Sequence, residues 1–182
     1  MAFIDPPRGD AGDVANYERA FAHRPEVYAA WRELNGAIKA GMDARRYELV
    51  TLAAAGALRS SYCALAHASV LLEGGLATAD EVAAVVGGDA VAGLSDAEAA
   101  VVAFAARVAA DATAITQDDV AVLRAAGLSD ADVFDVVAAA TARCFFSKTL
   151  DALGVRADAR YAALEPAALR EALTVGRPIA DG

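Results

Sequence analysis

One stretch indicates the fold class most directly: GLSDAEAAVVAFAARV, residues 93–108. Ser95 follows a Gly-Leu pair, and Glu98 follows Ser95 at the three-residue spacing of a capping box, which marks a helix start. Beyond this point valine, phenylalanine and alanine recur at helical spacing, so one side of the segment is apolar. The stretch therefore predicts an amphipathic helix over about residues 96–111, with its apolar side in a core.

The same pattern of helix starts recurs along the chain. Further capping-box pairs are Thr78 with Glu81, Thr116 with Asp119, and Ser129 with Asp132. Gly-Leu pairs precede three of the four boxes, and the glycine can end one helix before the Ser or Thr begins the next. With apolar periodicity and Pro25 as a first-turn residue, the sequence predicts helices over about 13–22, 25–40, 43–58, 60–73, 79–86, 96–111, 117–126, 130–153 and 166–174.

Composition supports an all-α fold. Of the 182 residues 50 are alanine, the best helix former, whereas aromatic residues make up only 7%. A hydrophobic content of 57% excludes a disordered chain. This length fits a single domain. We therefore expect one multi-helix bundle over residues 13–175, preceded by a flexible arm over 1–12 and followed by a tail over 176–182.

Charge and hydropathy limit the partners. The formal net charge is −9 and no window is a run of Lys or Arg, so nucleic acid is not an expected partner. The longest stretches without charge, Leu49–Leu58 and Ser60–Leu72, are shorter than the ~20 residues of a membrane span. The first residues lack the pattern of a signal peptide. Two cysteines do not make a disulfide scaffold. We expect a cytoplasmic protein that does not contact membranes.

One segment carries candidate chemistry. Cys63 and His67 are four residues apart and so share a face of a predicted helix. If Ser60 is the N-cap of that helix, Cys63 lies in its first turn, where the helix dipole and the neighbouring Arg59 favour a thiolate. Glu48, on the preceding predicted helix, could hold the His67 imidazole in one tautomer.

These residues resemble the motif of the carboxymuconolactone decarboxylase and alkylhydroperoxidase D superfamily. The peroxidase branch of that family carries Glu-x11-Cys-x2-Cys-x3-His. Glu48, Cys63 and His67 match its acid, its second cysteine and its histidine without gaps. Ser60 replaces the first cysteine, so the chain has a Ser-x-x-Cys variant of the motif. Tyr62 stands where some members place a relay histidine.

The resemblance extends over about residues 20–155 and implies a function. It implies a thiol-dependent peroxidase that reduces hydrogen peroxide or organic hydroperoxides through a sulfenate on Cys63, with His67 as acid-base group and Glu48 orienting it. It implies no metal and no organic cofactor, and a homo-oligomer, either a trimer or a hexamer. Because a serine cannot form the family's disulfide, Cys63 would have to be resolved by Cys144, a small thiol or a partner protein, and an unknown thiol reductant is needed.

Other interpretations of the same residues stay open. The decarboxylase branch suggests a lyase that acts on a small lactone acid with His67 as acid-base group. A non-catalytic helical oligomer with a degenerate site is a third possibility. Ser60 could be only a helix cap, and Tyr62 could serve only packing. A zinc site would need Cys63, His67 and Glu48 together.

Overall fold

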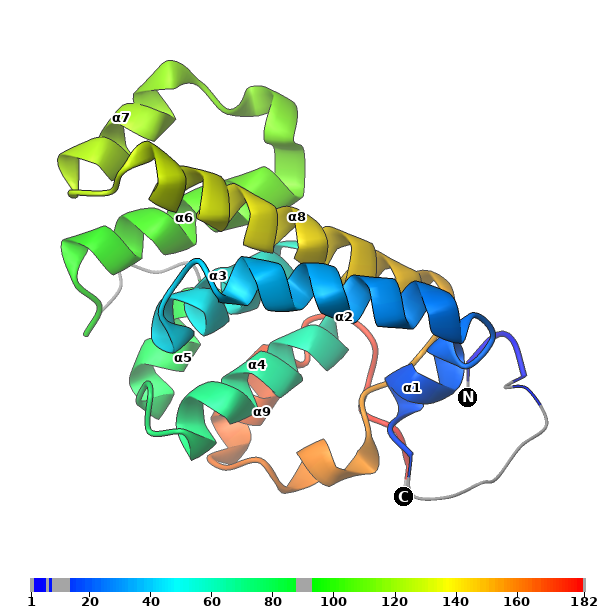
Figure 1. Ribbon diagram of the computed structural model, residues 1–182. Coiled ribbons are helices and arrows are strands. Elements are labelled where there is room, and N and C mark those ends of the chain that lie inside the picture. Colours follow the sequence, from blue (N-terminus) through cyan, green and yellow to red (C-terminus); the bar gives the residue numbers. More distant parts are fainter. Residues whose placement is uncertain (1, 6, 8–13, 88–92, 182) are drawn as a thin grey trace.

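The computed structural model describes residues 2–5, 7, 14–87 and 93–181 (Figure 1). Over these residues it contains α-helices and two short 3₁₀ helices and no β-strand, so the predicted all-α fold is confirmed. In chain order the elements are α1 (Asn16–Phe21), α2 (Pro25–Lys39), α3 (Ala44–Ala57), α4 (Ser61–Glu73), α5 (Ala79–Gly87), α6 (Asp96–Asp111), η1 (Ala112–Ala114), α7 (Gln117–Ala125), α8 (Asp130–Ala152), η2 (Ala159–Ala163) and α9 (Ala167–Leu173).

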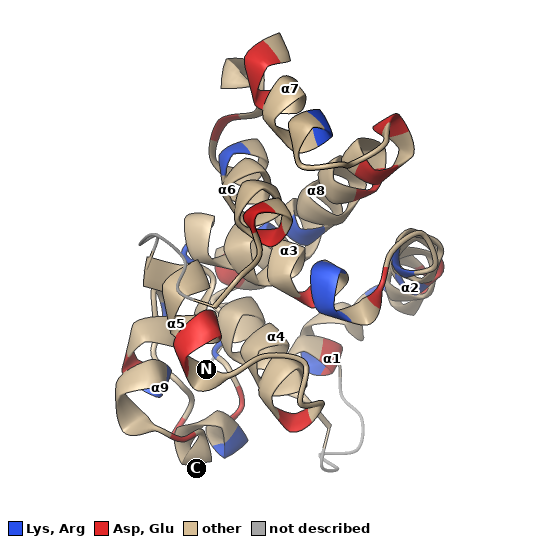
Figure 2. Ribbon diagram, turned by 90° about the vertical axis from the view of Figure 1, so that its left-hand side faces the viewer, with Lys and Arg blue, Asp and Glu red and all other residues tan. Residues whose placement is uncertain are grey.

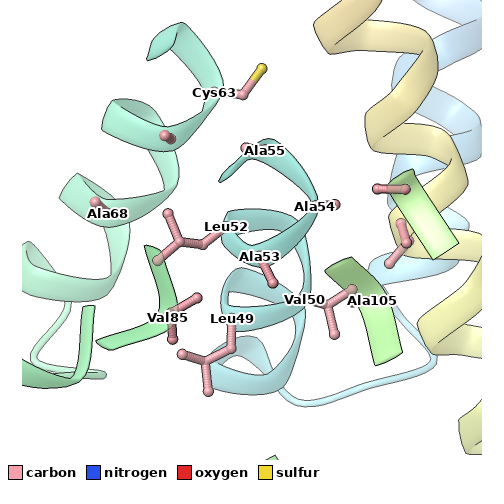
Figure 3. Packing of buried hydrophobic residues seen from close by; sticks show 14 of the residues in the cluster. Leu49, Val50, Leu52, Ala53, Ala54, Ala55, Cys63, Ala68, Val85 and Ala105 are labelled. Atoms are coloured by element: carbon pink, nitrogen blue, oxygen red, sulfur yellow. The ribbon is translucent and has the colours of Figure 1, made fainter. Parts of the chain in front are cut away.

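Helix α3 is the centre of the bundle. It packs against α4, α6 and α8 at once, and an unbroken run of its residues from Tyr47 to Ala55 is buried. Small side chains such as those of Ala53 and Ala54 let three neighbouring helices approach its backbone closely. Figure 3 shows these alanines between the leucine and valine side chains of the core. The alanine-rich composition is therefore explained by close helix packing.

Four helices begin at the predicted capping boxes, and the predicted glycines precede three of these starts. At all four predicted capping boxes the side chain of the Ser or Thr and that of the acid each accept a backbone N–H of the other residue. Gly75, Gly93 and Gly127 adopt positive φ angles of 61°, 96° and 91°, the left-handed conformation that terminates a helix. The red residues on α7 in Figure 2 include the acidic first turn of this helix, which contains one of the four capping boxes. The two 3₁₀ helices were not predicted because such short elements show no apolar period.

Helices α2 and α8 lie side by side and antiparallel (Figure 1). The Trp31 and Phe146 rings are 4.3 Å apart between centroids at one end of the pair. At the other end Gly41, just beyond α2, lies against Asp135 near the start of α8. Tyr28 and Trp31 face the rest of the molecule and line a cavity, whereas most of the opposite face of α2 is exposed.

Only part of the two terminal segments is described. The predicted arm over 1–12 falls largely on positions outside the described residues. In the C-terminal segment the Gly176 amide donates a hydrogen bond to Ser61 Oγ at 2.8 Å. The Ala180 amide donates to the Ala157 carbonyl at 2.8 Å. The described residues after α9 thus contact the start of α4 and the chain that follows α8.

Candidate functional site

A tight junction joins α3 to α4. Arg59 has a φ of 55°, a left-handed conformation that is rare for a residue with a side chain. The amide of Ser60 donates to the Ala55 carbonyl at 2.9 Å, which closes the end of α3 as in a Schellman motif. This junction sets the direction in which α4 leaves, and therefore where Cys63 lies.

Ser60 is the N-cap residue of α4, but its side chain makes no capping hydrogen bond. The residue is fully buried, and its hydroxyl is directed toward the Asp151 carboxyl without forming a regular hydrogen bond. Burial raises the pKa of Asp151, and the Ser60 hydroxyl offsets part of that shift. Ser60 therefore faces α8 at the base of α4 and does not line the cavity described next.

A cavity of about 810 Å³ lies between α2, α4, α8 and η2. Of the predicted site residues Cys63, His67, Glu48 and Tyr62 line it. Its walls are strongly aromatic and include Tyr17, Tyr28, Trp31, Tyr47, Phe146 and Tyr161. This volume is within the range of pockets that hold a small organic molecule.

Glu48, which is buried, and His67, which is partly exposed, form a pair on one wall of this cavity. The Glu48 side chain is only 3% exposed, and its Oε2 lies 2.5 Å from His67 Nδ1. Lys39 Nζ lies 3.3 Å from the other carboxylate oxygen. Burial by itself raises the pKa of Glu48, but the hydrogen bonds and charges of His67 and Lys39 outweigh it, and the net shift is downward. Glu48 is thus a carboxylate that is hydrogen-bonded to the imidazole of His67.

His67 is a neutral imidazole in this setting. Burial and the positive charge of Arg143 lower its pKa to about 4, against the opposing effect of Glu48. Because the ring is neutral, Nδ1–H donates to the Glu48 carboxylate and Nε2 keeps a free lone pair. His67 can therefore accept a proton at Nε2, and once protonated it gives that proton up readily.

Cys63 lies against a buried arginine that sequence reasoning missed. The thiol is 1% exposed, and Arg143 Nη1 is 3.7 Å from its Sγ. Figure 3 shows the sulfur projecting from the first turn of α4. A guanidinium at this distance stabilises a thiolate. One signal could have found Arg143: it is the only charged residue between Asp135 and Lys148 in the long helix α8.

Tyr62 is held by a network of its own. Its hydroxyl donates to the Asp158 carboxylate and accepts from the Tyr17 amide at 3.4 Å. Burial and the Asp158 carboxylate raise the pKa of this hydroxyl well above its usual value. The ring packs edge-on against Tyr17 and Tyr161. Tyr62 therefore ties α4 to α1 and to the segment before η2, and it stays protonated.

The second cysteine does not line the cavity. Cys144 is half-buried next to Arg143 in α8, and burial raises the pKa of its thiol. Within the described ranges no cluster of three or more His, Cys, Asp or Glu side chains could hold a metal ion. The described helices also include none with the length and apolar character needed to cross a membrane.

Comparison with known proteins finds similarity to one family over part of the chain. Residues 25–107, from α2 through most of α6, match the model of the carboxymuconolactone decarboxylase family. The matched segment contains Glu48, Ser60, Cys63 and His67. None of the curated proteins matches the chain in sequence.

Solved structures share most of the bundle. An alkylhydroperoxidase AhpD core, an uncharacterized peroxidase-related protein from Ralstonia eutropha JMP134, is 23% identical with a TM-score of 0.74, covering 83% of this chain and 80% of that one. A peroxidase-related protein from Silicibacter sp. TM1040 is 20% identical, TM-score 0.76, covering 89% and 94%. A variant of the debrominase Bmp8 in complex with 2,3,4-tribromopyrrole is 18% identical, TM-score 0.69, covering 89% and 82%. At these identities the likeness establishes the AhpD-like fold.

Proposed function

We propose that the protein is a thiol-dependent peroxidase that reduces hydroperoxides at Cys63. The observation that carries the proposal is that one cavity brings together the Cys63 sulfur, the Arg143 guanidinium 3.7 Å away, and the His67–Glu48 pair. A thiolate is the reactive form of cysteine toward peroxide. The family match and the peroxidase-related structures support the same class of reaction.

The oxidation step uses each of these groups. The Cys63 thiol transfers its proton to Nε2 of His67, directly or through a water, and Arg143 stabilises the sulfur anion. The thiolate attacks the outer peroxide oxygen, an S–O bond forms and the O–O bond breaks. The leaving hydroxide or alkoxide takes the proton from the His67 imidazolium, a strong acid because the pKa of His67 is lowered to about 4. Sulfur is oxidised to the sulfenic acid by two electrons, and the peroxide is reduced to water or an alcohol.

Reduction of the Cys63 sulfenic acid, which completes the catalytic cycle, requires two thiols supplied by other molecules. Ser60 stands where the peroxidase motif has its other cysteine, and a hydroxyl cannot form the disulfide. A first thiol therefore condenses with the sulfenic acid and releases water, and a second reduces the mixed disulfide and restores Cys63. Such thiols are plentiful in the reducing cytoplasm, where we place the protein.

Mass spectrometry tests this function directly. One equivalent of hydrogen peroxide in the presence of dimedone should give a single dimedone adduct in the wild type and in Cys144→Ser, and none in Cys63→Ser. Peroxide consumption in the presence of dithiothreitol should require Cys63. It should fall at least about tenfold in His67→Gln, since general acid-base groups contribute ~10²–10⁴-fold. Circular dichroism controls for folding.

Two outcomes would overturn the proposal in favour of the alternatives. The AhpD-like fold also carries a debrominase, so the fold alone does not fix the reaction. Turnover of a lactone acid that persists in Cys63→Ser but disappears in His67→Gln would indicate a lyase. An unreactive Cys63 with no turnover of either substrate would indicate a non-catalytic module.

A further inference from the structure

Arg143 is a buried cation without a carboxylate partner among the described residues. It is 4% exposed, its Nε has no hydrogen-bond partner, and its contact in the cavity is the weak one from Nη1 to the Cys63 sulfur. Burying an unpaired charge is costly, so such a group is normally paired with an anion. A guanidinium has five N–H donors in a planar fork, more than one sulfur atom can use.

The acidic residues of the cavity do not supply this anion. Glu48 is already bonded to Lys39 and His67. Glu73 and Glu165 line the cavity but are exposed residues. The buried end of the cavity beside Cys63 therefore carries a positive charge that the described part of the chain leaves unneutralised.

Planar aromatic side chains surround Arg143. Its Cζ lies 5.8 Å from the centre of the Trp31 ring and 5.4 Å from that of Phe146. The Tyr28 and Trp31 rings are nearly parallel, at 10°, with 6.2 Å between centroids. Trp31 Nε1 is buried and has no hydrogen-bond partner, so a second donor at this wall is unused. Aromatic walls favour a planar ligand, and the unused donors favour an acceptor on it.

We propose that Arg143 is the anion subsite of this cavity and that the ligand is a small planar aromatic acid, bound through its carboxylate. The inference rests on the proposed function, because it takes the cavity as the substrate site: the substrate is an aromatic carboxylate that bears the hydroperoxide. A cavity of about 810 Å³ has room for such a molecule and far exceeds hydrogen peroxide. A bidentate guanidinium–carboxylate pair fixes the ligand beside the Cys63 sulfur.

Tryptophan fluorescence reads out binding, because Trp31 is the single tryptophan of the chain and lines the cavity. The probes are benzoate, an anion at pH 7, and benzamide, its neutral counterpart of the same shape. Both are titrated into the wild type and into Cys63→Ser, which has no thiolate to compete for Arg143. Benzoate should bind at least about tenfold more tightly than benzamide in both proteins.

Variants of two arginines that line the cavity distinguish binding of the carboxylate at Arg143 from a general electrostatic attraction of anions to the cavity. Arg143→Met should remove the preference for benzoate, and Arg143→Lys should retain part of it, since a lysine keeps the charge but not the planar fork. Arg160→Met makes the same change at an exposed arginine that lines the same cavity, and it should keep the preference within about threefold. Melting temperatures show whether each variant is folded.

The inference fails if benzoate and benzamide bind equally to the wild type, or if Arg143→Met keeps the preference. It also fails if benzoate binds only to Cys63→Ser, because the thiolate is then the sole anion of Arg143. These titrations require no peroxide. A reactive Cys63 without benzoate preference would therefore leave the peroxidase proposal standing. Benzoate preference with an unreactive Cys63 would overturn the peroxidase proposal and the hydroperoxide substrate, and it would leave only the anion subsite at Arg143.

Discussion

At the scale of single residues, Cys63 and Ser60 show how little separates this site from the paired-cysteine motif. Both belong to the first turn of α4, Ser60 as N-cap and Cys63 as the third helical residue. Residues at this spacing have Cβ atoms ~5–6 Å apart, slightly more than the ~3.5–4.5 Å of a disulfide. A small movement at the helix start would close that gap. We therefore propose that the site lacks only the second sulfur and that its geometry would allow a disulfide.

Replacement of this serine tests that interpretation. Ser60→Cys treated with one equivalent of peroxide should lose two hydrogen atoms in its intact mass and resist dimedone, because the new thiol condenses with the Cys63 sulfenic acid. The wild type should instead trap dimedone, and excess peroxide should carry it to the sulfinic acid. Ser61→Cys is the matched control, since residues two apart on a helix do not face each other. A Cys63–Cys144 disulfide in the mildly oxidised wild type would contradict this prediction.

The His67–Glu48 pair predicts a pH dependence of stability. The pKa of His67 is lowered to about 4, against ~6.5 in the unfolded chain, so between these values the unfolded state binds a proton that the native state does not. The free energy of unfolding should therefore fall as the pH drops from about 6.5 to 4, by on the order of 2–3 kcal/mol from this group. The lowered pKa of Glu48 acts in the same direction.

Urea denaturation at a series of pH values measures this effect. His67→Gln keeps a donor for the Glu48 carboxylate but cannot titrate, so its stability should change less between pH 4 and 6.5. Identical pH profiles for the two proteins would show that His67 does not carry the lowered pKa.

At the scale of elements, the α3–α4 junction depends on a segment far away in sequence. Gly176 donates its amide to Ser61, and Arg59 Nε donates to the Val175 carbonyl at 3.2 Å. A Cβ on Gly176 would overlap the Arg59 carbonyl oxygen. The residues after α9 therefore hold the turn that places Cys63, and glycine is required there by close packing rather than by a positive φ.

Two glycine substitutions should have opposite effects. Gly176→Ala should lower the free energy of unfolding by about 1–3 kcal/mol, because the methyl group and the Arg59 carbonyl cannot occupy the same space. Gly36→Ala, in α2 with nothing within 4 Å of the new methyl group, should raise it by up to ~1 kcal/mol through helix propensity. Chemical denaturation measures both. Wild-type stability of Gly176→Ala would mean that the C-terminal segment does not lie against this junction in solution.

At the scale of the whole molecule, α2 and α8 present large apolar side chains to solvent. The exposed fractions are 41% for Val27, 55% for Leu34, 70% for Phe134 and 45% for Phe145. Exposed apolar surface on two neighbouring helices is typical of a protein interface. We propose that a second copy of the chain covers it, which agrees with the trimer or hexamer that the sequence resemblance implies.

Light scattering coupled to size exclusion tests the assembly. The wild type should elute as a homo-oligomer at micromolar concentration, and Leu34→Glu or Phe134→Glu should shift it toward the monomer, because a buried charge at an interface is costly. Val122→Glu, a comparable change at a 57% exposed position of α7, should leave the assembly intact. A monomeric wild type would contradict this proposal.

The sequence by itself determined the helices and their ends, because caps, glycine stops and apolar periods act within about four residues along the chain. It also predicted Cys63 and His67 on one face of a helix, and in the structure His67 Nδ1 is hydrogen-bonded to Glu48. The tertiary structure alone decided which other residues lie at Cys63. The Cys63–Arg143 contact joins residues 80 apart in sequence, and Ser60 does not line the cavity although it lies only three residues before Cys63. Such features depend on the packing of whole helices, which no local pattern encodes.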